Sequence, residues 1–133
     1  MTAQTFTPES YASEPVRHPP LLVIDLVAEA GAVTDGYRNM VVNRVNQHCL
    51  RLAVFDGTYP WHHHPASDEL FLVVEGCLII DLPDAPSLRL GPWQMATVPA
   101  GTIHRTRTEG RTVNLCFEQL EADTVFVDNP PSD

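Results

Sequence analysis

The sequence predicts an all-β protein, a sandwich or a barrel, built as one domain. Many short segments carry β-branched or alternating apolar residues, which is typical of strands. Turn-forming residues fall between these segments, which is typical of antiparallel sandwiches and barrels. The length of 133 residues, with 44% hydrophobic and 19% charged residues, suits a single globular domain. The turn signals are Asp56-Gly57, Pro83 to Pro86, Gly91-Pro92, Pro99 to Gly101 and Glu109-Gly110.

The amino-terminal part of the chain divides into an arm and the start of the domain. Residues 1–20 contain four prolines among Ser, Thr and Glu, which predicts an extended or disordered arm. The next segment, LLVIDLVAEAGA (residues 21–32), begins like a strand and is expected to end in a short helix that Gly31 stops. We expect the barrel domain to span residues 21–127 and a flexible tail to follow at 128–133.

Strands are expected along most of the remaining chain. Side chains alternate between the two faces of a strand. Asn114 and Cys116 therefore share a face, which either lines a pocket or packs within the sheet. Arg51 would anchor an anionic substrate if it pointed inward and would be solvated if it pointed outward, and strand parity alone does not decide between the two. The expected strands are residues 39–46, 48–55, 69–75, 77–82, 94–99 and 111–120.

The composition excludes several classes of function. The formal net charge is −9, with only 8 basic residues, which argues against nucleic acid as a partner. No apolar stretch approaches the roughly 18 residues that a membrane span needs, so no membrane partner is expected. The amino terminus lacks a signal-peptide pattern, which indicates a cytoplasmic protein. Cys49, Cys77 and Cys116 have no CxxC spacing, and we interpret them as reduced thiols.

The stretch YPWHHHPASDEL (residues 59–70) contains three consecutive histidines. If it is extended, His62 and His64 share one face and His63 points the other way. A turn after His64 can bring Glu69 beside this pair, and His104 is a fourth candidate further along the chain. Imidazole and carboxylate together suit a transition metal such as Fe, Mn, Co, Ni, Cu or Zn. The alternative is a solvated polar loop that happens to contain histidines.

The chain resembles the cupin superfamily at two motifs. The stretch from Gly57 to Gly76 resembles the first motif, in which a glycine is followed by HxH, a glutamate and a second glycine. The segment PAGTIH, which ends at His104, resembles the second motif, P-x-G-x-x-H. The similarity is to small single-domain bacterial cupins, and it implies a jelly-roll (double-stranded β-helix) barrel with little helix. It also implies one bound divalent transition metal ion, with His62, His64, Glu69 and His104 as ligands.

Two positions depart from the second motif. Trp93 stands where the superfamily has a glycine, six residues before the motif's proline, and Thr108 stands where it has a later asparagine. We expect Gly91 to supply the tight turn instead, because glycine adopts positive φ without steric cost. Neither departure affects an expected ligand, although both affect the loop near the site.

The resemblance implies a metal-dependent enzyme of the oxygenase, isomerase or cyclase type that acts on a small organic substrate. A non-catalytic cupin that binds or senses a small molecule is the alternative, and a metal that only stabilises the barrel is a third interpretation. Acid–base chemistry would need a further polar group, for which Tyr59, Arg51 and Cys116 are the candidates. Several polar groups in the pocket would favour an enzyme, whereas a wholly apolar lining would favour binding.

Resemblance to small cupins also implies a homodimer. We expect the apolar run LLVIDLV (residues 21–27) to add a strand to the partner's sheet, since pairing satisfies the exposed backbone groups of a sheet edge. Phe55 and Trp61 are expected to add apolar area outside the barrel. The alternative is a monomer in which the run packs on its own barrel.

Overall fold

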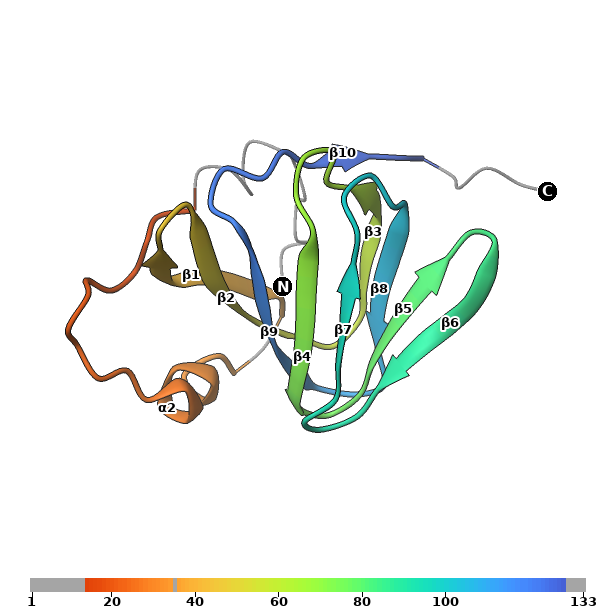
Figure 1. The fold of residues 1–133 in the computed structure, drawn as a ribbon. Helices are drawn as coiled ribbons and strands as arrows, with labels where there is room; N and C mark the ends of the chain where they lie inside the picture. The colour runs from red at the N-terminus through yellow and green to blue at the C-terminus, as the bar shows by residue number, and fades with distance from the viewer. Residues whose placement is uncertain (1–13, 35, 129–133) are drawn as a thin grey trace.

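The computed structural model describes residues 14–34 and 36–128, so residues 1–13 of the predicted arm and 129–133 of the predicted tail lie outside it. The chain forms two five-stranded antiparallel sheets (Figure 1). The first sheet has the order β1 (Arg38–Val45), β2 (His48–Phe55), β9 (Thr112–Gln119), β4 (Glu69–Glu75) and β7 (Met95–Val98). The second has the order β10 (Val125–Phe126), β3 (Thr58–His63), β8 (His104–Thr108), β5 (Leu78–Leu82) and β6 (Ala85–Leu90).

The chain crosses between the sheets at nearly every connection from β2 to β9. Sequence neighbours such as β2 and β3 or β4 and β5 therefore lie in different sheets, and strands that pair, such as β2 and β9, are far apart in sequence. This is the jelly-roll arrangement, and it confirms the predicted fold class. Strand β6 was not expected from the sequence, because its Pro86 and exposed side chains hide the apolar signal of a strand.

No helix within the described ranges has the length and apolarity to cross a membrane.

The segment expected to begin as a strand does not form one. Residues 21–25 have no strand pairing, and the helix α2 (Leu26–Gly31) follows them directly. The Asp25 side chain accepts a hydrogen bond from the backbone N–H of Ala28 at 3.1 Å, which caps the helix. Helix α2 ends at Gly31, as predicted. Further upstream, Val16 forms a parallel bridge with Val41 of β1.

Two apolar clusters hold the fold together. The first lies between the sheets and includes Phe71, Val73, Leu78 and Ile80. The second lies where α2 packs against β2, around Leu52 and Val54. The side chains of both clusters are withdrawn from water, which is the main driving force for folding. The full membership of the first is Phe55, Phe71, Val73, Leu78, Ile80, Leu90, Val98 and Cys116, and that of the second is Ala30, Met40, Val42, Leu52, Val54 and Val113.

The two aromatic residues expected outside the barrel have different positions. Phe55 is only 5% exposed and belongs to the core between the sheets, so the expectation that it adds apolar area outside the barrel is wrong. It is the last residue of β2 and shares a face with Ala53, which lines the interior. Trp61 is half-buried on the outside, with the Arg105 guanidinium 4.9 Å from its ring centroid.

The turn before β7 also differs from the expectation. Trp93 itself adopts the left-handed conformation, with φ of 65°, whereas Gly91 is not among the described glycines with positive φ. The backbone N–H of Gly91 instead donates a hydrogen bond to the Gln94 side-chain oxygen at 2.8 Å. A non-glycine residue held in this region costs of the order of 1 kcal/mol. A left-handed residue with a large exposed side chain therefore stands where the second motif has a glycine.

Gly76, between β4 and β5, is expected to be the least replaceable turn residue. Its φ is 88°, and an added Cβ would overlap the Arg111 carbonyl oxygen and lie 2.9 Å from the Thr112 Cα. Gly76→Ala should therefore lower the free energy of unfolding by about 2–4 kcal/mol, measured by urea denaturation. Gly110→Ala is the control, because Gly110 has a similar φ of 74° but open space around it. A loss at Gly110 equal to that at Gly76 would contradict the steric explanation.

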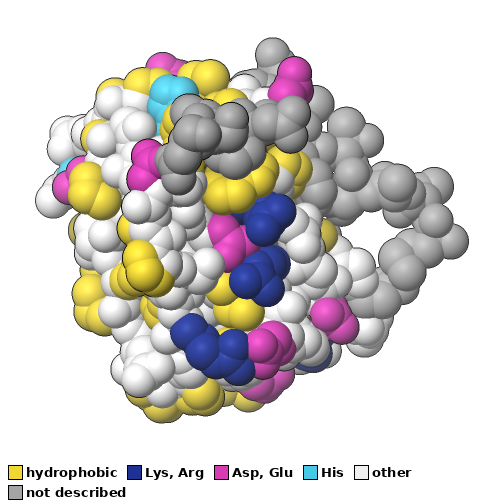
Figure 2. Space-filling view, turned by 90° about the vertical axis from the view of Figure 1, so that its right-hand side faces the viewer, with side chains coloured by type: hydrophobic (Ala, Val, Ile, Leu, Met, Phe, Trp, Pro, Cys, Tyr) yellow, Lys and Arg dark blue, Asp and Glu magenta, His cyan; other side chains and the backbone are white. Residues whose placement is uncertain are grey.

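Asp81 links three side chains on the outer face of the second sheet. Its carboxylate accepts hydrogen bonds from Arg105 at 2.8 Å, Arg107 at 2.8 Å and Ser87 at 2.5 Å. In Figure 2, dark blue Lys or Arg side chains lie beside magenta Asp or Glu side chains on the side of the molecule that carries β5 and β6. Arg105 and Arg107 thus face away from the histidine cluster, as strand alternation predicts.

Asp81→Asn is expected to lower the free energy of unfolding by about 2 kcal/mol at neutral pH, because charge-assisted hydrogen bonds are lost. Burial raises the pKa of Asp81, but the hydrogen bonds from Arg107, Ser87 and Arg105 outweigh it and lower the pKa to about 2. A depressed folded-state pKa stabilises the fold above the unfolded value and ceases to do so as the pH falls through about 2. Urea denaturation at pH 6 and pH 2 should show the difference between wild type and variant shrinking in acid. The exposed Glu109, paired with Arg89, offers Glu109→Gln as a control with a smaller expected loss, because solvent screens an exposed ion pair.

Candidate metal centre

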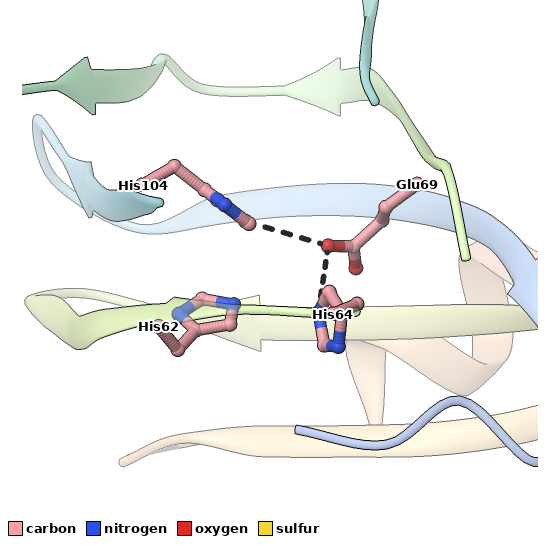
Figure 3. Close-up of side chains that lie close together, drawn as sticks. All are labelled: His62, His64, Glu69 and His104. Atoms are coloured by element: carbon pink, nitrogen blue, oxygen red, sulfur yellow. Dashed lines mark ion pairs between the residues drawn. The ribbon is translucent and has the colours of Figure 1, made fainter. Parts of the chain in front are cut away.

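Four side chains converge in the interior (Figure 3). Three of them belong to strands β3, β4 and β8, and the fourth directly follows β3. They are His62, His64, Glu69 and His104, all buried, and one potential donor atom from each lies within 4.8 Å of the others. His63 is not a member of the group. The alternation predicted for the three consecutive histidines therefore matches the structure.

The sheet register explains why these distant residues meet. His62 on β3 pairs directly with His104 on β8, and their ring centroids lie 4.3 Å apart. His64 follows the end of β3, and Glu69 is the first residue of β4, so a short turn joins them. Figure 3 shows the Glu69 carboxylate directed between His64 and His104. The Glu69 Oε1 lies 3.2 Å from His64 Nε2 and 3.6 Å from His104 Nε2.

The three imidazole rings are held in one orientation by backbone carbonyls. The Nδ1–H of His62 donates to the Pro60 carbonyl at 2.7 Å, that of His64 to Asp123 at 3.0 Å and that of His104 to Thr102 at 2.9 Å. In a neutral imidazole a donating Nδ1 leaves Nε2 as the acceptor. All three Nε2 lone pairs are thereby available to a cation, and such outer hydrogen bonds are typical of histidines that bind metals.

Burial and charge set the protonation of the cluster. Burial lowers the pKa of His62 to about 3, which keeps this ring neutral. Burial also lowers the pKa of His64, but the adjacent Glu69 side chain outweighs it and the net shift is upward. Burial would raise the pKa of Glu69, yet the adjacent His104 and His64 imidazoles bring it well below its usual range. The cluster therefore holds a carboxylate anion among imidazoles.

The donor set fits a divalent transition metal ion. Imidazole nitrogen and carboxylate oxygen bind such ions at about 2.1 Å, so two ligands of one ion lie about 3–4 Å apart. The separations of 3.2 and 3.6 Å fall in this range. Within the described part of the chain, Glu69 Oε1 and His104 Nε2 are buried without a hydrogen-bond partner of good geometry. A cation would satisfy both atoms.

A cavity of about 30 Å³ opens beside His62, His64 and Glu69. One water molecule needs about 10–15 Å³ by this kind of measure, so the space suits only a small ligand unless side chains move. Ala53, Phe55 and Phe71 form the apolar part of its wall. The polar part of the wall consists of Tyr37, Asn39, Tyr59, Thr106, Asn114 and Cys116.

The three catalytic candidates have different positions. Tyr59 is buried and lines the cavity, with its ring centroid 4.9 Å from that of His62 and 5.6 Å from that of Tyr37. Cys116 also lines the cavity, together with Asn114. Arg51 points inward and is only 2% exposed, but it lies outside the cavity wall and pairs with Glu118 at 2.9 Å.

The sequence did not single out Tyr37, Asn39 or Glu118. Tyr37 directly precedes β1, and Asn39 is the second residue of that strand. The Asn39 Nδ2 donates to the Tyr37 hydroxyl at 3.1 Å. Glu118 follows Asn114 and Cys116 at two-residue spacing on β9, so strand alternation could have found it. Burial raises the pKa of Glu118, but the Arg51 guanidinium, with its Nε 2.9 Å from Oε1, opposes this shift and favours the carboxylate.

The chain is similar to cupin proteins in both sequence and structure. A cupin domain model (Cupin_2) matches residues 51–117. The uncharacterized protein YdbB of Bacillus subtilis is 49% identical over 107 residues, which is 80% of this chain and 95% of YdbB. A cupin-2 domain protein from Shewanella frigidimarina has a similar crystal structure, with a TM-score of 0.68 and 25% identity over 73% of this chain and 94% of its own.

A second solved structure adds an enzyme to these similarities. A chain from crystal structures of the DMSP lyases RdDddP and RnDddQII has a TM-score of 0.56 and 27% identity over 63% of this chain. The match covers 46% of that lyase chain. The two motifs, the jelly roll and the matched domain model agree, and the chain belongs to the Cupin_2 family of cupin domains.

Proposed function

We propose that this protein is a metal-dependent enzyme that acts on a small organic substrate at the His62, His64, Glu69 and His104 cluster. The observation that carries the proposal is the convergence of four buried donor atoms, with each imidazole fixed by a backbone carbonyl. A bound divalent ion would supply Lewis-acid polarisation of a substrate oxygen or, for a redox-active metal, activation of dioxygen. An ion held by four protein ligands still has coordination positions for a substrate oxygen or for dioxygen.

The polar wall of the cavity supports catalysis over simple binding. Burial raises the pKa of both Tyr37 and Tyr59, so their phenols stay protonated and act as hydrogen-bond donors. Burial also raises the pKa of Cys116, which argues against a thiolate nucleophile. Tyr59, in contact with His62, is therefore the best of the predicted catalytic candidates for orienting a substrate oxygen.

The reaction type is proposed to be an oxygenation, an isomerisation or a cyclisation of a small oxygen-bearing substrate. Similarity to the DMSP lyase chain supports an enzymatic role and adds elimination to the reactions worth testing. The small cavity supports a compact substrate, since larger molecules would need the aromatic wall to move.

The first experiment is elemental analysis of the chain purified without added metal, followed by oxygen-uptake and product screens on small enols, phenols and hydroxy acids. We expect close to one transition metal ion per chain and turnover of at least one class. The variant Tyr59→Phe should lower kcat at unchanged metal content. A metal-loaded chain that binds these compounds without turnover would favour the non-catalytic binding function, and a chain without metal affinity would overturn the proposal.

We further propose that the protein is a cytoplasmic homodimer. Leu21, Val23 and Val27 are strongly exposed and offer apolar area to a second copy. The cysteines Cys49, Cys77 and Cys116 are free thiols, which a reducing compartment preserves.

Light scattering of the full chain and of a chain that begins at Asp25 tests the assembly. A dimer for the full chain and a monomer for the shortened one would support an interface at residues 21–24. A monomeric full chain would contradict the dimer, and a dimer in both would move the interface elsewhere.

A further inference from the structure

A second carboxylate lies next to the histidine cluster. Glu118 extends from β9 into the interior, on the same face as Cys116 and Asn114, and its side chain has no exposed surface. Its Oε2 lies 4.0 Å from His64 Nε2, the nitrogen that faces the cluster. Glu118 is thus a buried acid that the four-residue donor set does not include.

The Oε2 atom of Glu118 lacks a hydrogen-bond partner among the described residues. Buried carboxylate oxygens are costly unless they accept hydrogen bonds or meet a cation. The other oxygen, Oε1, forms an ion pair with Arg51 Nε at 2.9 Å, whereas Oε2 lies on the side of the cluster, 4.0 Å from His64 Nε2.

Oε2 of Glu118 lies near the donor group without belonging to it. Glu118 is absent from the group whose donors all lie within 4.8 Å of one another, which argues against a fifth protein ligand. An oxygen bound to the ion at about 2.1 Å, and hydrogen-bonded to a carboxylate at about 2.7 Å, bridges a longer gap. A hydroxyl on a coordinated ligand would meet this requirement.

Neighbouring side chains hold Glu118 in place. Arg51 donates from Nη1 to the Asn39 Oδ1 at 3.2 Å, and Asn39 donates to the Tyr37 hydroxyl at 3.1 Å. The polar chain therefore runs from the cavity wall at Tyr37, through Asn39 and Arg51, to Glu118 beside His64. A carboxylate anchored in this way is pre-organised, which reduces the entropy lost when a ligand binds.

Building on the proposed function, we propose that Glu118 determines substrate specificity by accepting a hydrogen bond from a hydroxyl group on the metal-bound ligand. The site would then select small 2-hydroxy acids, enols and diols over molecules of equal charge that lack the hydroxyl hydrogen. A site built to accept a substrate hydrogen bond rejects analogues without it, because its own buried polar group stays unpaired.

Glycolate and acetate form the matched pair of probes, since both are monoanions and they differ by one hydroxyl group. The full chain is loaded with Co²⁺, its metal content is measured, and each probe is titrated by visible absorbance. We expect the parent to prefer glycolate, and Glu118→Gln to reduce the glycolate-to-acetate preference about tenfold. Glu75→Gln removes an exposed carboxylate and should leave the preference unchanged.

A second variant covers the case in which the single change destabilises the fold. Arg51→Met with Glu118→Leu removes both charges together, which buried pairs often tolerate, and it should abolish the preference for glycolate. An unaltered preference in either metal-loaded variant would assign Glu118 a structural role only and overturn the inference. Failure of the parent to bind Co²⁺ would instead overturn the proposed function, so the two failures are distinguishable.

Discussion

Replacing His62 or His104 with alanine is expected to lower the affinity for a divalent transition metal by about a hundredfold or more, whereas His63→Ala should leave it within about twofold. The reason is geometric, because His62 and His104 face each other across β3 and β8 while His63 lies outside the donor group. Loss of an outer-shell partner alone typically costs ten- to a hundredfold, and loss of a ligand should cost at least as much.

Metal content after dialysis against a weak chelator checks this prediction, together with a competition titration for the affinity itself. His63→Ala is a matched control, since it removes the same side chain from the adjacent position. Circular dichroism of each variant verifies that the barrel still forms. Equal metal loss from His63→Ala would contradict the assigned face of β3.

Arg51→Met is expected to lower the free energy of unfolding by about 3–5 kcal/mol. Arg51 and Glu118 are 2% and 0% exposed, so removing the cation leaves a carboxylate buried without its partner. Arg51→Met combined with Glu118→Leu should recover most of the loss, because apolar residues replace both charges. Urea denaturation of the two single variants and the double variant gives the coupling energy, and additive losses would contradict the ion-pair explanation.

The fold class was predictable because jelly-roll strands leave local signals. The alternating segments and turn residues identified most strands, and the two motifs identified the topology. The segment at residues 21–24 was misassigned because its apolar residues suggest burial, whereas Asp25 caps a helix directly after them and Leu21 and Val23 remain exposed. Strand β6 was missed because its proline-containing sequence is exposed at every residue except Leu90.

The four-residue cluster was predictable for a different reason. Strand parity placed His62 and His64 on one face, and a turn after His64 offered Glu69. The motif supported His104, which no local pattern connects to the other three. Arg51 was left undecided, and the structure turns it inward because Glu118 on the neighbouring strand provides the opposite charge. A buried ion pair between strands distant in sequence has no local signature, so only the paired register of β2 and β9 reveals it.

The conformation of Trp93 was also not predictable from local sequence. The sequence offered Gly91 as the residue for the tight turn, yet Trp93 takes the positive φ. The backbone N–H of Trp93 donates to the Val73 carbonyl at 2.6 Å, and Val73 donates back to the Gln94 carbonyl at 3.1 Å. Pairing with β4 therefore holds the strained conformation, a long-range effect that residue preferences do not report.

The most direct test of the metal centre is a crystal structure of the protein grown with its native metal, with diffraction recorded above and below the absorption edge of that metal. We predict one anomalous peak per chain, at about 2.1 Å from the Nε2 atoms of His62, His64 and His104 and from a carboxylate oxygen of Glu69. A peak elsewhere on the chain, with these four side chains unoccupied by metal, would contradict the account.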